Sequence, residues 1–182
     1  MYSTQRLFRP ISVATFLFLI PVSSRLVAQS TSDSSDLYPA RESSLDLFGS
    51  AAVGQQTLDH LSGLKVNRDF RLGAGAGMNY FVTRNIGLGV DAYTENTSHS
   101  FVDSTSLNVI GRLPLGRSGF APYVYGGVGR VFDANEAWFG QGGAGIEYRF
   151  NRKVGVFLDG RYVFPDGLTH YGLGRLGMRF TF

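Results

Sequence analysis

The chain has 182 residues, with 17 Lys and Arg against 14 Asp and Glu, and it contains no cysteine. Three of the basic residues lie in the first 28 positions, which contain no acid, so the remaining 14 basic residues balance the 14 acids. The basic excess therefore gives no support for nucleic-acid binding. The lack of cysteine excludes disulfides, thiolate metal sites, a cysteine nucleophile and a lipid-modified cysteine.

Residues 1–28 have the features of a secretory signal peptide. Arg6 and Arg9 form a basic start, residues 11–22 form an apolar run, and Ala28 ends a passable cleavage motif. The apolar run covers about 12 residues, where a membrane-spanning helix needs about 20. We predict cleavage after Ala28, followed by a flexible periplasmic lead-in at residues 29–42, which are rich in Ser and Asp.

Residues 43–182 form one domain in which short segments of alternating apolar and polar residues are separated by Gly, Asn, Pro or Asp. A period of two is typical of a strand with one apolar face. We predict eight antiparallel strands, at residues 43–53, 69–82, 86–95, 100–113, 120–132, 138–150, 153–164 and 170–182. The connections after the second, fourth and sixth strands are short, and the others are longer or more polar, as in barrels with periplasmic turns and extracellular loops.

The last strand shows why we predict a transmembrane β-barrel. Leu176, Met178, Phe180 and Phe182 alternate with a face that carries Arg175 and Arg179. An apolar outer face, a charged inner face and an export signal are typical of an eight-stranded, up-and-down outer-membrane barrel. A soluble lipocalin-like barrel, which needs the opposite polarity, is the alternative fold. Glycines such as Gly75 would leave space inside a narrow barrel. Aromatic residues near the strand ends would form girdles at the membrane interfaces: Phe70, Tyr80, Phe81, Phe120, Tyr123, Tyr125, Tyr148, Phe150, Tyr162, Phe164, Phe180 and Phe182.

Three stretches resemble the hairpins of a known group: residues 80–92, residues 122–129 and the terminal Arg-Phe-Thr-Phe at residues 179–182. The chain resembles the OmpA/OmpX-like eight-stranded outer-membrane barrels, which include opacity- and Ail-type surface proteins. The resemblance implies a location in the outer membrane of a Gram-negative-type bacterium. It also implies that the outer-membrane assembly machinery recognises Leu176, Met178, Phe180 and Phe182.

Alternation places a set of charged side chains inside the barrel. These are Arg71, Asp91, Glu95, Arg112, Arg130, Glu147, Arg149, Asp159, Arg161, Arg175 and Arg179. The fifth strand is ambiguous, because Tyr123 and Tyr125 compete with Val124 and Val128 for the lipid side. We place Arg130 inside because an arginine facing lipid at mid-depth costs about 2–4 kcal/mol. Since eight strands leave a lumen that side chains can fill, we expect a charged plug, with a narrow Arg-lined pore as the alternative.

Other motifs give weaker hypotheses. Residues 140–145 match the dinucleotide-binding glycine pattern, but a strand-like segment follows where a helix is required. His60, His99 and His170 map to the predicted extracellular end without a ligand partner at short spacing. His99 lies between Ser98 and Ser100 with Glu95 nearby, but neighbours on a strand face opposite sides. We therefore expect no catalytic, cofactor or metal site, and keep a lipid hydrolase using His99 as a third hypothesis.

We expect a monomeric surface protein that supports envelope integrity and contacts outer-membrane lipid and lipopolysaccharide, but not nucleic acid. Any adhesion or partner contact would fall on the loops at residues 54–68, 95–100, 133–137 and 165–169. The alternative function is a small Arg-lined porin for slow passage of ions or small solutes.

Overall fold

The computed structural model describes residues 37–56, 67–95, 102–116, 118–132, 136–167 and 170–182. The predicted signal peptide and residues 29–36 of the predicted lead-in lie outside these ranges, as do parts of the longer connections. Within the described ranges, no helix is both long and apolar enough to cross a membrane.

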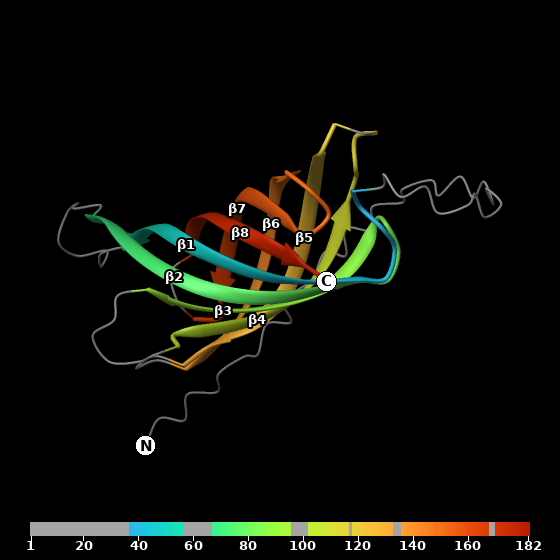
Figure 1. Ribbon diagram of the computed structural model, residues 1–182. Coiled ribbons are helices and arrows are strands. Elements are labelled where there is room, and N and C mark those ends of the chain that lie inside the picture. Colours follow the sequence, from blue (N-terminus) through green and yellow to red (C-terminus); the bar gives the residue numbers. More distant parts are fainter. Residues whose placement is uncertain (1–36, 57–66, 96–101, 117, 133–135, 168–169) are drawn as a thin grey trace, which may run out of the picture. The chain divides into compact units, whose positions relative to one another are not determined.

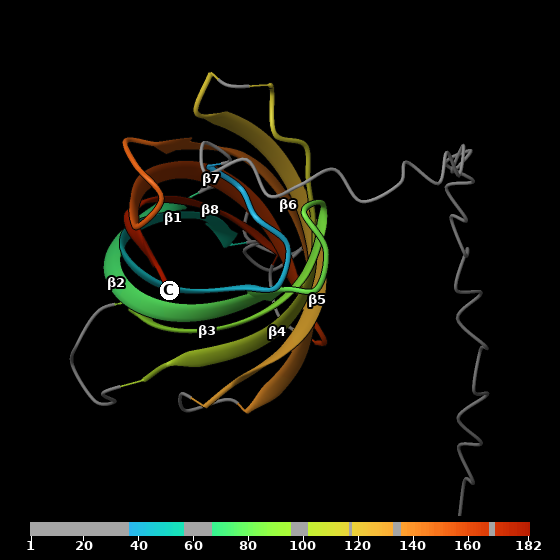
Figure 2. The same cartoon turned by 45° about the vertical axis from the view of Figure 1, so that its right-hand side comes forward.

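Eight antiparallel strands pair in sequence order, and the last pairs with the first to close a barrel (Figures 1 and 2). This confirms the predicted fold class. The strand bounds lie within a few residues of the predicted ones. The strands are β1 (Glu42–Gln56), β2 (Asn67–Phe81), β3 (Ile86–Glu95), β4 (Ser104–Arg112), β5 (Phe120–Val131), β6 (Ala137–Arg149), β7 (Val154–Pro165) and β8 (Tyr171–Thr181).

Three short connections meet at one end of the barrel, here called the turn end, and the opposite end is called the loop end. At residues 82–85, the Thr83 hydroxyl accepts hydrogen bonds from the backbone N–H groups of Asn85 and Ile86. At residues 150–153, the Asn151 side chain accepts from two backbone N–H groups in the same way. These local side-chain bonds are what make Thr and Asn effective turn residues.

The outer surface is apolar and is organised in bands. Aliphatic side chains such as Leu107, Val124 and Leu158 are exposed across its middle. Exposed aromatic rings lie toward the turn end (Tyr80, Phe120, Phe150, Phe182) and toward the loop end (Phe70, Phe132, Trp138, Tyr162, Phe164). Three of the rings predicted for the girdles point into the barrel instead: Phe81, Tyr123 and Tyr125.

Inward-facing glycines let aromatic rings lie against the barrel wall. A Cβ on Gly75 would fall 2.5 Å from the ring of Phe48, and a Cβ on Gly143 would fall 2.6 Å from the ring of Tyr125. The same Cβ on Gly143 would also lie 2.6 Å from the carbonyl oxygen of Gly160, and that oxygen cannot move without distorting the sheet. The rings of Phe48 and Tyr125 therefore require glycine at these positions.

Replacing Gly143 by Ala is expected to lower the free energy of unfolding by about 1–3 kcal/mol, the usual cost of overpacking. Gly142→Ala is the matched control, because its Cβ would point outward and meet nothing closer than 3.9 Å. The measurement is the denaturant midpoint of the refolded protein in detergent. Equal midpoints for the two variants would show that the close packing of Tyr125 against Gly143 does not require a glycine there.

Candidate functional site: the charged interior

Ten charged side chains from six strands fill the middle and the turn end of the lumen, and all are buried. They form two groups within the described residues. The turn-end layer consists of three carboxylates and three arginines: Glu42, Asp46, Glu147, Arg112, Arg149 and Arg179. The central layer consists of two carboxylates and two arginines: Asp91, Asp159, Arg161 and Arg175. Each layer is therefore neutral when all its members are ionised.

Glu42 and Glu147 organise the turn-end layer. Both terminal nitrogens of Arg149 donate to the Glu42 carboxylate, at 2.5 and 2.6 Å, and its Nε donates to Glu147 at 2.6 Å. Arg112 donates to Glu42 at 3.1 Å and lies 3.6 Å from Glu147. Because Glu42 is on β1 and the two arginines are on β4 and β6, these bonds cross the lumen.

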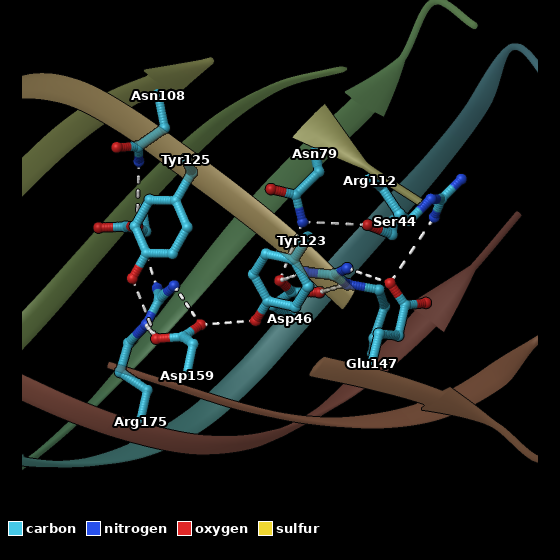
Figure 3. A network of polar contacts seen from close by, with 12 residues as sticks. Ser44, Asp46, Asn79, Asn108, Arg112, Tyr123, Tyr125, Glu147, Asp159 and Arg175 are labelled. Atoms are coloured by element: carbon cyan, nitrogen blue, oxygen red, sulfur yellow. Dashed lines mark hydrogen bonds and ion pairs between the residues drawn. The ribbon is translucent and has the colours of Figure 1, made fainter. Parts of the chain in front are cut away.

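Arg179 links the turn-end layer across the closing seam of the barrel. Its Nε and Nη2 both donate to the Asp46 carboxylate at 2.7 Å, which is the bidentate arrangement of a strong ion pair. Its remaining terminal nitrogen donates to Glu147 at 2.5 Å. The Asn79 amide donates to Asp46 at 2.9 Å (Figure 3). All three nitrogens of the Arg179 guanidinium therefore donate to a carboxylate.

Residues 37–41, here called the strap, close the turn end. Tyr38 is 1% exposed, and the guanidinium carbons of Arg112 and Arg149 lie 4.8 and 4.3 Å from its ring centre. Its hydroxyl donates to the carbonyl of Gly119 in the β4–β5 turn. Burial raises the pKa of the Tyr38 hydroxyl well above its usual value, so the hydroxyl stays protonated and able to donate.

Arg149 also donates to the carbonyl of Leu37 at 2.6 Å, which fixes the start of the strap. Arg41 adopts φ 57° and turns the chain from the strap into β1. Figure 2 shows this segment in blue, running along the turn end before it enters β1. Glu42, which the sequence analysis assigned to the flexible lead-in, is the first residue of β1.

The central layer has two carboxylates, each shared between several donors. Arg175 donates to both oxygens of Asp159, at 2.8 and 2.7 Å, and to Asp91 at 3.1 Å. Arg161 donates to both oxygens of Asp91, at 3.3 and 3.0 Å. The hydroxyls of Tyr123 and Tyr125 donate to Asp159 at 2.6 and 3.0 Å (Figure 3).

Uncharged side chains complete the central layer. Ser106 donates to Asp91 at 2.8 Å, and the Asn108 amide donates to the same carboxylate at 3.3 Å. Gln141 accepts from Arg161 at 2.8 Å and donates to Asn108 at 2.6 Å. Both oxygens of Asp91 and of Asp159 therefore accept hydrogen bonds from protein donors.

A cavity of about 20 Å³ lies between the two layers, lined by side chains that include Asp46, Asp91, Arg175 and Arg179. This volume is close to what a single buried water requires.

The structure brings eight of the eleven predicted lumen charges together in the two layers: Asp91, Arg112, Glu147, Arg149, Asp159, Arg161, Arg175 and Arg179. Arg71 points inward nearer the loop end, with its guanidinium 5.5 Å from the ring centre of Tyr171. Glu95 ends β3, and its side chain lies outside the described part.

Arg130 differs from the prediction, because it lies on the outer face of β5. Tyr123 and Tyr125 point inward to Asp159, so Val124, Val128 and Arg130 must point outward. Arg130 lies next to the loop end of the strand, where an arginine facing outward costs only about 0–1 kcal/mol. The mid-depth penalty that favoured an inward side chain therefore does not apply.

The sequence analysis missed several members of the layers, above all Glu42 and Asp46. Asp46 lies between Leu45 and Leu47, so strict alternation along β1 would have identified it as inward. Glu42 carries no such signal, because the residues before it are not in a strand. The uncharged members Asn79, Ser106, Asn108 and Gln141 were not in the predicted set, because that set was restricted to charged residues.

The remaining candidates are placed as follows. Residues 140–145 lie within β6, and a strand continues after them. His170 is exposed at the loop end, where its Nδ1 lies 3.3 Å from the Tyr162 hydroxyl. Among the described residues, no group of three potential ligands could hold a metal ion. His60, His99, Ser98 and Ser100 lie outside the described part, so the hydrolase hypothesis is not addressed.

Leu176, Met178 and Phe182 are exposed on the outside of the barrel, and Phe180 is half-buried. The four residues that the resemblance links to assembly thus face outward on β8 or directly after it.

Comparison with known proteins gives no match to a family model or to a curated protein. The fold, however, matches solved structures. The N-terminal β-barrel domain of Pseudomonas aeruginosa OprF aligns with a TM-score of 0.60 at 18% identity, covering 79% of this chain and 99% of that one. Neisserial surface protein A gives a TM-score of 0.58 at 13% identity, covering 77% and 97%.

The attachment invasion locus protein Ail of Yersinia pestis, solved with the heparin analogue sucrose octasulfate, gives a TM-score of 0.53 at 13% identity. The alignment covers 79% of this chain and 99% of Ail. At these identities the match concerns the fold alone. Together with the closed eight-stranded topology and the apolar exterior, it shows that this chain has the fold of the small outer-membrane β-barrels.

Proposed function

We propose that the chain is a small protein of the bacterial outer membrane, with a structural and surface-interaction role, whose lumen is closed by the turn-end and central layers. Pairing of five buried arginines with five buried carboxylates carries this proposal. A conducting channel needs a continuous path that ions can enter and leave. Here each arginine of the layers is held by at least two hydrogen bonds.

The proposed orientation places the turn end in the periplasm and the loop end outside the cell. Short periplasmic turns and longer extracellular loops are the general arrangement of such barrels. The basic, apolar and cleavable residues 1–28 support export through a signal peptide. Surface contacts then fall to the loops at the outer end, and the outward residues of β8 are proposed as the assembly determinants.

Single-channel conductance in a planar bilayer tests the closed lumen. The refolded protein is expected to give no discrete steps, after a difference in migration between unheated and boiled samples on SDS gels has shown that it is folded. Discrete steps from the unmodified protein, changed by replacing Arg175 or Arg179, would overturn the closed lumen and establish the alternative, a small Arg-lined porin.

The two layers also predict how the lumen can be opened. Arg175→Ser removes a cation from the central layer, and Arg179→Ser removes one from the turn-end layer. Each single variant should remain silent, because the other layer is intact. The double variant should conduct and should prefer cations, since the layers would then hold five carboxylates and three arginines. If either single variant conducted as well as the double variant, the two layers would not act as two separate barriers along the lumen.

A further inference from the structure

A cleft of about 240 Å³ lies on the outside of the barrel at the loop end, lined by Arg130, Glu136, Ala137, Trp138 and Asp166. It is separate from the lumen, because Arg130 and Trp138 occupy paired outward positions on β5 and β6. The backbone N–H of Asp166 donates to the carbonyl of Trp138 at 2.8 Å, so the start of the β7–β8 connection borders the same cleft. Three charged side chains and one indole ring therefore line the same cleft.

Arg130 supplies the cationic side of the cleft. Its guanidinium carbon lies 5.7 Å from the ring centre of Phe132 and 5.9 Å from that of Trp138. One terminal nitrogen donates to the Glu136 carboxylate, and the Arg130 side chain remains 42% exposed. A guanidinium has five N–H donors, so donors are left for an anion that approaches from outside.

Glu136 and Asp166 supply the anionic side. The Glu136 side chain is 63% exposed, and Asp166 is exposed as well. Trp138 is 64% exposed, and an indole face is the best aromatic partner for a cation. The cleft thus offers one position for an anion and, beside it, carboxylates and a ring suited to an ammonium group.

We propose that this cleft binds the phosphoethanolamine headgroup of a membrane lipid, with the phosphate beside Arg130 and the primary ammonium between Trp138 and the two carboxylates. This inference rests on the proposed membrane location. The cleft belongs to the band of exposed aromatic rings at the loop end, and in a membrane such rings sit at headgroup depth. A purely anionic headgroup would meet two carboxylates balanced by a single arginine. A quaternary ammonium would offer those carboxylates no N–H donor.

Trp138 is the only tryptophan of the chain, so its fluorescence reports on this cleft alone. The full chain, refolded in detergent micelles, is titrated with short-chain phosphatidylethanolamine, phosphatidylcholine or phosphatidylglycerol. We expect a saturable shift in Trp138 emission with phosphatidylethanolamine, at an affinity about tenfold higher than for the other two lipids, the difference expected of one charged hydrogen bond. Equal shifts with all three lipids would overturn the proposal.

Arg130→Gln and Glu136→Gln should each weaken the phosphatidylethanolamine response about tenfold. Glu136→Gln should also remove the preference over phosphatidylglycerol. Lys153→Gln, an exposed charge in a turn at the opposite end of the barrel, is the matched control and should leave the titration unchanged. Soluble phosphoethanolamine should bind far more weakly, and saturation by it at the same concentration would overturn the assignment to a lipid.

Failure of this inference can be distinguished from failure of the proposed function. A protein that does not insert into vesicles and shows no heat-dependent gel shift would contradict the membrane location. A folded, inserted protein whose Trp138 emission does not discriminate between headgroups would overturn only the headgroup site.

Discussion

Glu147→Gln is expected to lower the free energy of unfolding by about 3–5 kcal/mol, because it leaves buried guanidinium groups without their shared counter-ion. Glu147 is 0% exposed and lies within 3.6 Å of three arginines, Arg112, Arg149 and Arg179. The substitution preserves the volume of the side chain, so the loss reports on charge and not on a cavity. The loss of stability is measured by denaturant unfolding in detergent, with the gel shift between folded and unfolded protein as the readout.

The control for Glu147 is Glu136→Gln, which removes a carboxylate from an exposed pair with Arg130. Exposed pairs contribute about 0.2–1 kcal/mol, so this variant should unfold almost like the unmodified protein. If Glu147→Gln and Glu136→Gln shift the unfolding midpoint equally, the stability of the turn-end layer does not depend on Glu147.

Tyr38→Ala is expected to lower the free energy of unfolding by about 3 kcal/mol, as is usual when a large buried aromatic side chain is truncated. The guanidinium carbons of Arg112 and Arg149 lie 4.8 and 4.3 Å from the ring centre, and both arginines lose this aromatic contact. The measurement is again the unfolding midpoint. The access of water to the turn-end layer can be followed in parallel by hydrogen exchange of the backbone amides of Leu37 and Arg149.

Tyr38→Phe separates the ring from the hydroxyl. It keeps the contact with both arginines and removes only the bond to the carbonyl of Gly119, so a loss of about 1 kcal/mol is expected. Should Tyr38→Ala be as stable as Tyr38→Phe, the strap would not contribute to closing the turn end.

The eight strands, their order and most of the inward charges could be predicted from the sequence because a two-residue period fixes the face of every side chain once one is known. This worked on β8, where Arg175 and Arg179 lie inside and Leu176 lies outside. It failed on β5, where tyrosines and valines are both compatible with lipid. Which face of β5 points inward depends on Asp159, which accepts a hydrogen bond from Tyr123. Asp159 lies on β7, so the residue pattern of β5 contains no sign of it.

The pairing inside the barrel could not be predicted, for a related reason. Arg149 and Glu42 are separated by 107 positions in the sequence. Their contact follows from the closure and register of the barrel, and an alternating pattern gives neither. The strap was missed because Tyr38 lies outside any strand, in a segment without an alternating pattern. Its ring packs against arginines on β4 and β6, which are far from it in the sequence.

The ion pairs of the interior have a consequence for how the barrel can form. Arg175 on β8 binds Asp91 on β3, Arg161 on β7 binds the same carboxylate, and Arg149 on β6 binds Glu42 on β1. Of the charges in the two layers, the first four strands carry three carboxylates and one arginine, and the last four carry four arginines and two carboxylates. Either half alone would therefore leave charges on one face without a partner. Entry of such an intermediate into a bilayer would require desolvation of unpaired charges. Insertion and closure of this barrel should therefore be a single cooperative event, and a partly assembled sheet should remain in water until the first and last strands meet.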